Sequence, residues 1–198
     1  MHLLFKHAKN NSKKEEKGLS LIESAMVLAL AATVTAGVMF YYQSASDSNK
    51  TQSAISEVMS ATSAINGLYI GQSSYNGLGA GVLVNSSAIP DNYKDSVAGK
   101  IRNPFGGELG VGPKNSGDGF GYYITLTNLP KSACVSLATL NLGTSAAGYG
   151  INVSSPEGDV RLSSSNSGST RTEAISPSDA TTQCNNATSN NKVTYFMK

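Results

Sequence analysis

The amino-acid sequence predicts an α+β protein in which one long N-terminal helix, of about 50 residues, carries a β-rich globular head. Three observations predict this fold class. An apolar stretch at residues 19–42 continues into residues 43–70 with helical spacing of its apolar side chains. No proline occurs before Pro90, so nothing breaks a helix over that distance. After Gly71 the sequence is rich in Gly, Ser, Asn and Thr with short apolar runs, which is typical of strands joined by many turns.

Residues 19–42 are the hydrophobic half of the predicted helix and have about the length that spans a bilayer core. Glu23 is their only charged residue. Lys13, Lys14 and Lys17 come directly before this stretch. The positive-inside rule therefore places the N-terminus in the cytoplasm and the rest of the chain across the membrane.

Residues 43–70 are the amphipathic half of the same helix. Apolar side chains recur here at spacings of three and four, which is typical of a helix face packed against a domain. The pair Asn66-Gly67 favours a C-terminal stop, so we expect one helix from Leu19 to Leu68. The positions that define the apolar face are Ile55, Val58, Met59, Thr62, Ile65 and Tyr69.

Residues 71–198 form the predicted head. Two short helices are expected at residues 131–140 and 178–185, after Pro130 and Pro177, because proline is favoured in the first turn of a helix. Each of these segments contains one cysteine. A Ser-rich, weakly patterned stretch is expected to be an exposed loop or a sheet edge. That stretch is residues 154–172, and the best strand candidates are residues 121–127, 150–153 and 192–197.

The positive charge of the chain is concentrated near its N-terminus. Five of the 15 basic residues precede Gly18, as do both histidines, His2 and His7. The remainder is near neutral, so a basic surface for nucleic acid is not indicated. If residues 1–18 are a cleaved leader, the mature protein has no imidazole, which excludes His-based catalysis and most zinc sites. We expect no enzymatic activity, no catalytic residue, no cofactor, no metal ligand and no nucleic-acid partner.

The two cysteines, Cys134 and Cys184, lie far apart and lack the CxxC spacing of zinc and redox sites. In an exported protein, a single structural disulfide is the expected state. A loop of this length would restrict the unfolded chain by roughly 4 kcal/mol. The alternative is two buried free thiols in a cytosolic protein.

The junction at residues 17–24 reads KGLSLIES and joins a basic flank to the apolar helix. A secretory signal is cleaved after its apolar run, but no A-x-A-like site follows this one. Cleavage after Gly18 instead would keep the helix and create a new amine at Leu19. A lone carboxylate within a membrane costs about 2.5 to 3.5 kcal/mol, so Glu23 of one subunit is expected to pair with the Leu19 amine of a neighbour. Snorkelling of Glu23 to the cytoplasmic headgroups is the alternative.

These features resemble those of the type IV prepilins. The resemblance is carried by the junction Gly18-Leu19-(x)3-Glu23, the following apolar helix and the C-terminal cysteine pair. Leu19 stands where one large branch of the family has phenylalanine, and no proline kinks the helix, so the chain is similar to the type IVb branch. Within that branch it resembles subunits of bundle-forming pili of enteric bacteria, and the match extends through residues 103–109 and 192–198.

The resemblance implies a head with an antiparallel β-sheet packed on the second half of the helix and closed by a Cys134–Cys184 disulfide. It also implies leader cleavage between Gly18 and Leu19 and N-methylation of Leu19 by a prepilin peptidase. The precursor would reside in the inner membrane. The expected further partners are other copies of the chain, an inner-membrane assembly machine, an outer-membrane secretin, and a receptor on host cells or bacteria.

The function expected from this resemblance is that of a major subunit of a type IVb pilus. The chain would polymerise through its N-terminal helix into extracellular fibres for bacterial aggregation and adhesion. A minor pilin or a pseudopilin of a type II secretion machine is the alternative, and a signal-anchored periplasmic enzyme is a third. The glycines of residues 77–81 favour a flexible turn over a nucleotide loop, because no strand-loop-helix context surrounds them.

Overall fold

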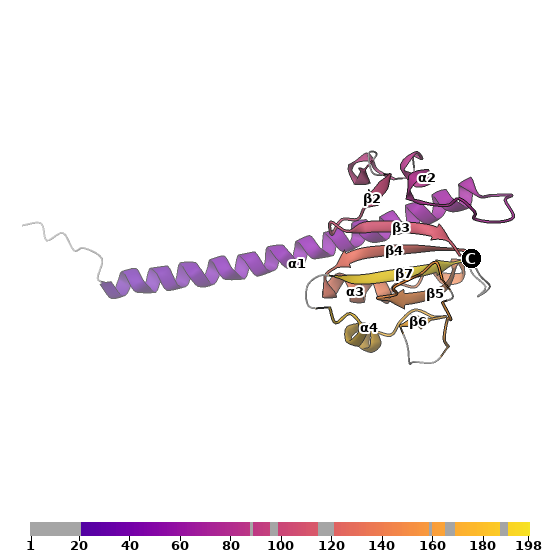
Figure 1. Ribbon diagram of the computed structural model, residues 1–198. Coiled ribbons are helices and arrows are strands. Elements are labelled where there is room, and N and C mark those ends of the chain that lie inside the picture. The colour runs from indigo at the N-terminus through magenta and orange to yellow at the C-terminus, as the bar shows by residue number, and fades with distance from the viewer. Residues whose placement is uncertain are drawn as a thin grey trace, which may run out of the picture. The chain divides into compact units, whose positions relative to one another are not determined.

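A computed structural model describes residues 21–87, 89–95, 99–114, 121–158, 160–164, 169–186 and 190–198 (Figure 1). The chain forms two compact units, Met1–Gln43 and Ser44–Lys198. The described part of the first unit is helical throughout. The second unit contains the rest of the first helix, a seven-stranded sheet and several short helices.

Helix α1 (Leu21–Leu68) is the longest element and ends at the residue that the sequence predicted. Gly67 still lies inside the helix, and the left-handed residue that follows the helix is Gly71, with φ of +80°. The expected start at Leu19 lies outside the described residues. The side chains of α1 that are buried in the second unit are Ala54, Glu57, Val58, Ala61 and Ile65.

The buried face of α1 agrees with the predicted amphipathic face at Val58 and Ile65, which are both fully buried. Met59 was expected on this face, but its side chain is 60% exposed. Apolar residues at spacings of three and four are compatible with more than one buried face, because neighbouring faces of a helix overlap. The face that is buried contains Ala54 and Ala61, which are only weakly hydrophobic and did not mark it in the sequence. Tyr122 of the sheet contacts α1 directly, because its hydroxyl donates to Asn66 Oδ1 at 3.2 Å.

The sheet has the strand order β1-β2-β3-β4-β7-β5-β6, and every pair of named neighbours is antiparallel. The C-terminal strand therefore lies in the middle, between β4 and β5 (Figure 1). Opposed residues at the centre include Ile124 and Tyr195, both fully buried. The strands are β1 (Lys94–Asp95), β2 (Lys100–Arg102), β3 (Glu108–Pro113), β4 (Tyr122–Leu129), β5 (Ala146–Ile151), β6 (Thr170–Arg171) and β7 (Asn191–Met197).

Two of the three predicted strands correspond to β4 and β7, whereas the third was displaced. Residues 150–153 were expected to be extended, but β5 ends at Ile151. The next residue, Asn152, has φ of +54° and cannot continue a strand.

The helices after Pro130 and Pro177 are α3 (Lys131–Ala138) and α4 (Pro177–Gln183), close to the predicted ranges. Pro177 occupies the first turn of α4, whereas Pro130 is the residue just before α3. Both helices lie beside the sheet in Figure 1. The remaining helical elements, which the sequence analysis did not identify, are α2 (Ala80–Val84), η1 (Asp91–Tyr93) and η2 (Gly143–Ser145).

The stretch at residues 154–172 was expected to be an exposed loop or a sheet edge. Its end forms the edge strand β6, but Arg171 in that strand is only 5% exposed. The guanidinium of Arg171 forms an ion pair with Asp179 of α4, at 3.1 Å between Nη1 and Oδ2. This pair attaches the edge of the sheet to α4, which explains why a residue in a weakly patterned segment is buried.

Candidate functional site

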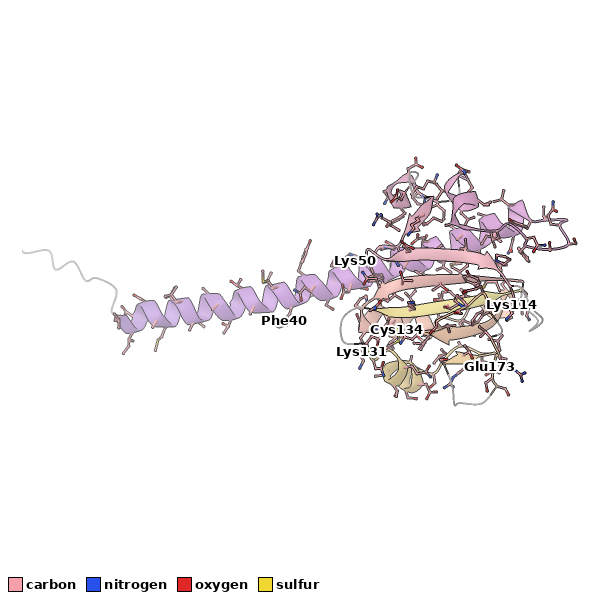
Figure 2. All side chains as sticks on the ribbon, viewed as in Figure 1. Phe40, Lys50, Lys114, Lys131, Cys134 and Glu173 are labelled. Carbon is pink, nitrogen blue, oxygen red and sulfur yellow. A yellow bond between two sulfur atoms is a disulfide. The ribbon has the colours of Figure 1, made fainter. Side chains whose placement is uncertain are left out.

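The first part of α1 is strongly apolar. None of the described residues from 21 to 43 is buried. Figure 2 shows side chains, Phe40 among them, projecting from this part of the helix on all sides. Large exposed apolar surfaces mark sites of contact with a membrane or with other proteins. The large apolar side chains, each more than 60% exposed, are Leu21, Ile22, Met26, Val27, Leu28, Leu30, Val34, Val38, Met39, Phe40, Tyr41 and Tyr42.

Among the described residues, α1 is the one helix long and apolar enough to cross a membrane. Its polar side chains fit such surroundings. Thr33 Oγ1 donates to Leu30 O at 2.9 Å and Thr35 Oγ1 donates to Ala31 O at 2.8 Å. Because these hydroxyls are satisfied within the helix, they can enter lipid or a helix bundle without an unpaired donor.

Glu23 lies in the first described turn of α1 and is exposed. A carboxylate is electrostatically favoured at this end of a helix, where backbone N–H groups point outward. Gly18 and Leu19 lie outside the described residues, as does the rest of the predicted leader. The cleavage site, the N-methylation site and the Leu19–Glu23 pair therefore remain predictions.

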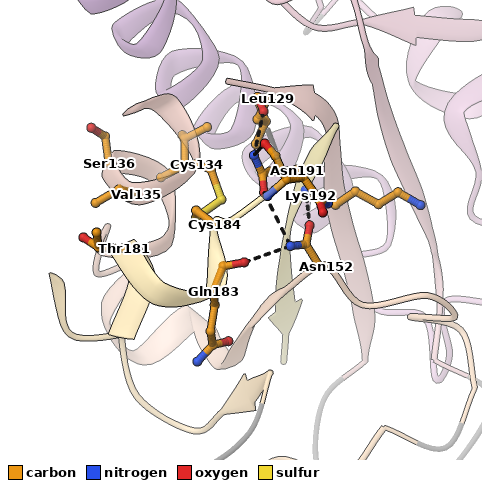
Figure 3. The surroundings of a disulfide bond; sticks show 12 residues. Leu129, Cys134, Val135, Ser136, Asn152, Thr181, Gln183, Cys184, Asn191 and Lys192 are labelled. Atoms are coloured by element: carbon orange, nitrogen blue, oxygen red, sulfur yellow. Dashed lines mark hydrogen bonds between the residues drawn. A yellow bond between two sulfur atoms is a disulfide. The ribbon is translucent and has the colours of Figure 1, made fainter. Parts of the chain in front are cut away.

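The disulfide of the head joins Cys134 of α3 to Cys184, the residue that follows α4 (Figure 3). Their Cα atoms are 5.9 Å apart and both side chains are fully buried. This is the pairing that the sequence and the prepilin resemblance predicted. The bond fixes two helices that come from distant parts of the chain against one another.

A polar network beside the disulfide was not anticipated from the sequence (Figure 3). Asn152 donates from Nδ2 to Gln183 O at 3.0 Å and accepts at Oδ1 from Lys192 N at 2.9 Å. Asn191, which is fully buried, donates from Nδ2 to Leu129 O at 3.3 Å. These bonds connect the end of α4 to β7 and to the end of β4. The only sequence signal for them is asparagine at the ends of apolar runs, which also marks ordinary turns.

Glu57 is a second feature that the sequence analysis missed. Its side chain is 3% exposed, and within the described part of the chain neither carboxyl oxygen has a hydrogen-bond partner. Burial raises the pKa of Glu57 to about 8, because the charged form is deprived of water. The carboxyl is therefore mainly neutral at neutral pH. Its position, three residues after Ala54 and four before Ala61, was a signal that it could lie on the buried face.

Two hollows on the described part of the head are lined largely by polar or small side chains. One hollow of about 450 Å³ lies between the start of the head portion of α1 and α3, with Asp47 as its charged residue. Another, of about 490 Å³, contains Tyr149, Glu173 and Lys198. Among the described residues, no group of three or more His, Cys, Asp or Glu side chains could hold a metal ion. The apolar helix is thus the most prominent candidate for function.

Comparison with known proteins gives consistent relatives. A family model described as bundlin matches residues 43–198. The chain is 70% identical over 187 residues to the "Major structural subunit of bundle-forming pilus" of Escherichia coli O111:H- and to the protein of the same name from Escherichia coli O127:H6 (strain E2348/69 / EPEC). Each alignment covers 94% of this chain and 97% of the relative.

A solved structure of a type IVb pilin from Salmonella typhi resembles this chain, with a TM-score of 0.50 and 21% sequence identity. The alignment covers 73% of this chain and 98% of that chain. At this identity the likeness establishes the fold alone. The type IV pilin fold, with a long N-terminal helix and an antiparallel head, is therefore confirmed.

Proposed function

This chain belongs to the bundlin family and is a pilus structural subunit, and we propose that it polymerises through α1 into fibres on the bacterial surface. The observation that carries this proposal is the exposed apolar part of α1, residues 21–42. Burying one such side chain contributes about 1.5 to 3 kcal/mol, so twelve of them strongly favour a packed bundle of helices over water. The fibres would serve bacterial aggregation and adhesion to host cells.

The proposed organisation assigns one task to each part of the chain. Residues 1–18 are a leader that a prepilin peptidase removes, and the new terminus at Leu19 is N-methylated. Residues 19–42 anchor the precursor in the inner membrane and later form the core of the fibre. Residues 43–70 support the head, which comprises residues 71–198 with the disulfide region at 134–184. The threonine hydroxyls of the apolar half support this plan, because they are satisfied within the helix.

Transfer from membrane to fibre exchanges one apolar environment for another. Hydrophobicity alone therefore does not select the fibre over the membrane, and a directional contact is needed. We assign this contact to the Leu19 amine of one subunit and the Glu23 carboxylate of its neighbour. An inner-membrane assembly machine would drive the transfer, and an outer-membrane secretin would pass the fibre to the surface. A receptor on host cells or bacteria would bind the exposed heads.

The test is an intact-mass and N-terminal analysis of protein sheared from the bacterial surface. We expect a chain that begins at methylated Leu19 and contains one disulfide. A Gly18→Glu variant is the matched control, because a charged side chain beside the cleaved bond should retain the leader and keep the protein in the membrane fraction. Sheared protein that still begins at Met1, or none in the sheared fraction, would refute the proposal.

A further inference from the structure

An exposed turn after α1 contains one of the two Asn-Gly pairs of the sequence, Asn76-Gly77. Leu78 N donates to Tyr75 O at 3.0 Å and closes the turn, while Gly77 adopts φ of +80°. A left-handed third residue is typical of a type II turn. Apart from Gly77 itself and its two neighbours in the chain, no heavy atom of the described residues lies within 4 Å of the position that a Gly77 Cβ would occupy, so the turn is open on that side.

From this geometry we propose that Asn76 is a site of spontaneous deamidation and isomerisation in the exported protein. The two groups that react, the Gly77 main-chain amide and the Asn76 side-chain amide, are adjacent in the chain. No hydrogen bond from the Gly77 amide N or from the Asn76 side-chain amide is present there. Glycine has no side chain that would hinder closure of a five-membered ring on its own nitrogen.

The reaction needs water and no other reagent. The Gly77 amide N loses its proton to solvent and attacks Asn76 Cγ, so that an N–Cγ bond forms and the Cγ–Nδ2 bond breaks. The side-chain nitrogen leaves as ammonia. Water then opens the cyclic imide at either carbonyl, which gives an aspartyl or an isoaspartyl residue at position 76. Both products carry one new negative charge, and the isoaspartyl product adds a carbon to the main chain.

The other pair, Asn66-Gly67, provides an internal comparison. It lies inside α1, where backbone N–H groups donate to carbonyls one turn earlier and fix the main chain. Asn66 Oδ1 also accepts a hydrogen bond from Tyr122 at 3.2 Å. A nucleophile held away from its target reacts up to about a hundred times more slowly. The same dipeptide should therefore react at position 76 and resist at position 66.

Conversion of Asn76 would affect the contacts of its neighbour Tyr75. Tyr75 packs on Tyr69 and on Tyr122, with ring centroids 5.4 and 4.8 Å apart. Its hydroxyl donates to Lys198 O at 3.4 Å. A longer main chain at position 76 would loosen the turn that positions Tyr75, and the new charge would make this surface more acidic as the protein ages.

Peptide mapping of purified full-length protein, incubated at body temperature in mildly alkaline buffer, tests the proposal. Neither lysine nor arginine lies between Lys50 and Lys94, so trypsin releases both Asn-Gly pairs in one peptide. The two asparagines are therefore exposed to the same sample treatment. Fragment masses then separate the two positions. We expect conversion at Asn76 to be at least roughly tenfold faster than at Asn66.

An isoaspartyl-specific methyltransferase gives a second measurement. Its signal should grow with incubation time in the natural protein and stay flat in an Asn76→Gln variant, whose longer side chain disfavours the cyclic imide. Equal rates at the two asparagines, or growth of the methyltransferase signal in that variant at the natural rate, would overturn the proposal. The measurement does not depend on fibre formation, so its failure is distinct from failure of the proposed function.

Discussion

The hydroxyl of Tyr195 donates a hydrogen bond of 2.8 Å to the main-chain carbonyl of Leu137, and both residues are fully buried. The bond joins β7, in the middle of the sheet, to the last turn of α3. It lies in the same region of the head as the disulfide, because α3 also carries Cys134. The hydrogen bond from Tyr195 and the disulfide at Cys134 therefore both hold α3 against the rest of the head.

Replacement of Tyr195 with phenylalanine should remove the hydrogen bond to Leu137 O and preserve the packing of the aromatic ring. Leu140 N also donates to Leu137 O, at 3.2 Å, so the carbonyl is not left without a partner. We therefore expect a loss of only about 1 kcal/mol in the free energy of unfolding. Denaturant unfolding of the detergent-solubilised protein measures it. A Tyr93→Phe variant, at a partly buried position of the head, is the control, and a loss above about 3 kcal/mol for Tyr195→Phe would contradict this account.

Removal of the disulfide should have a larger effect. Cys134 and Cys184 close a loop with a sequence separation of 50, and the double variant Cys134→Ala, Cys184→Ala should lower the free energy of unfolding by roughly 4 kcal/mol. The natural protein in a reducing agent should approach the stability of this variant, and the reducing agent should leave the variant itself unchanged. Equal stability of the oxidised protein and the variant would show that the bond does not contribute.

The sequence predicts those parts of this fold whose local pattern and environment agree. Strands β4 and β7 are rich in β-branched and aromatic residues, and α1 ends at the predicted residue. Strand β3 was missed because its glycines are typical of turns. In the structure Gly112 lies opposite Tyr123, and a Cβ there would approach the Tyr123 hydroxyl to 2.7 Å. The glycine therefore fits a neighbour that is distant in sequence, which no local pattern reveals.

At the candidate site, too, some features follow from the local sequence and others depend on tertiary packing. The apolar part of α1 is visible in the sequence because its apolar run is long and has Glu23 as its only charge, so no knowledge of distant neighbours is needed to identify it. Glu57 was not predicted because the helical pattern does not specify how wide the buried face is. Only the packing of the head decides that a carboxyl at this position loses contact with water.

Glu57 should make the stability of the head depend on pH. The pKa of this carboxyl rises from 4.5 to about 8 on folding, so the folded state binds the proton more tightly than the unfolded state. Its stabilising effect is complete below pH 4.5 and is lost as the pH rises to about 8, above which no further loss follows. The total loss is roughly 5 kcal/mol.

A Glu57→Gln variant tests this expectation because its amide does not titrate. Its unfolding free energy should vary less between pH 4.5 and about 8 than that of the natural protein, whatever its absolute stability. Exposed Glu173, replaced by glutamine, is the matched control and should leave the pH dependence almost unchanged. Parallel pH profiles of the Glu57→Gln variant and the natural protein would show that Glu57 is not the responsible group.

Glu23 should be needed for assembly but not for processing. In a membrane or a fibre core a carboxylate is costly to bury, and pairing with the Leu19 amine of a neighbouring subunit would reduce that cost. A Glu23→Ala variant should therefore lose its leader normally and reach the inner membrane, yet yield few fibres. Glu23→Gln keeps the size of the side chain and removes the charge, so it should show the same defect if charge pairing is the cause. The measurement is the amount of protein in the sheared fraction relative to the processed protein in the membrane. A normal fibre yield from both variants would refute the pairing and favour the alternative, in which Glu23 extends to the cytoplasmic headgroups.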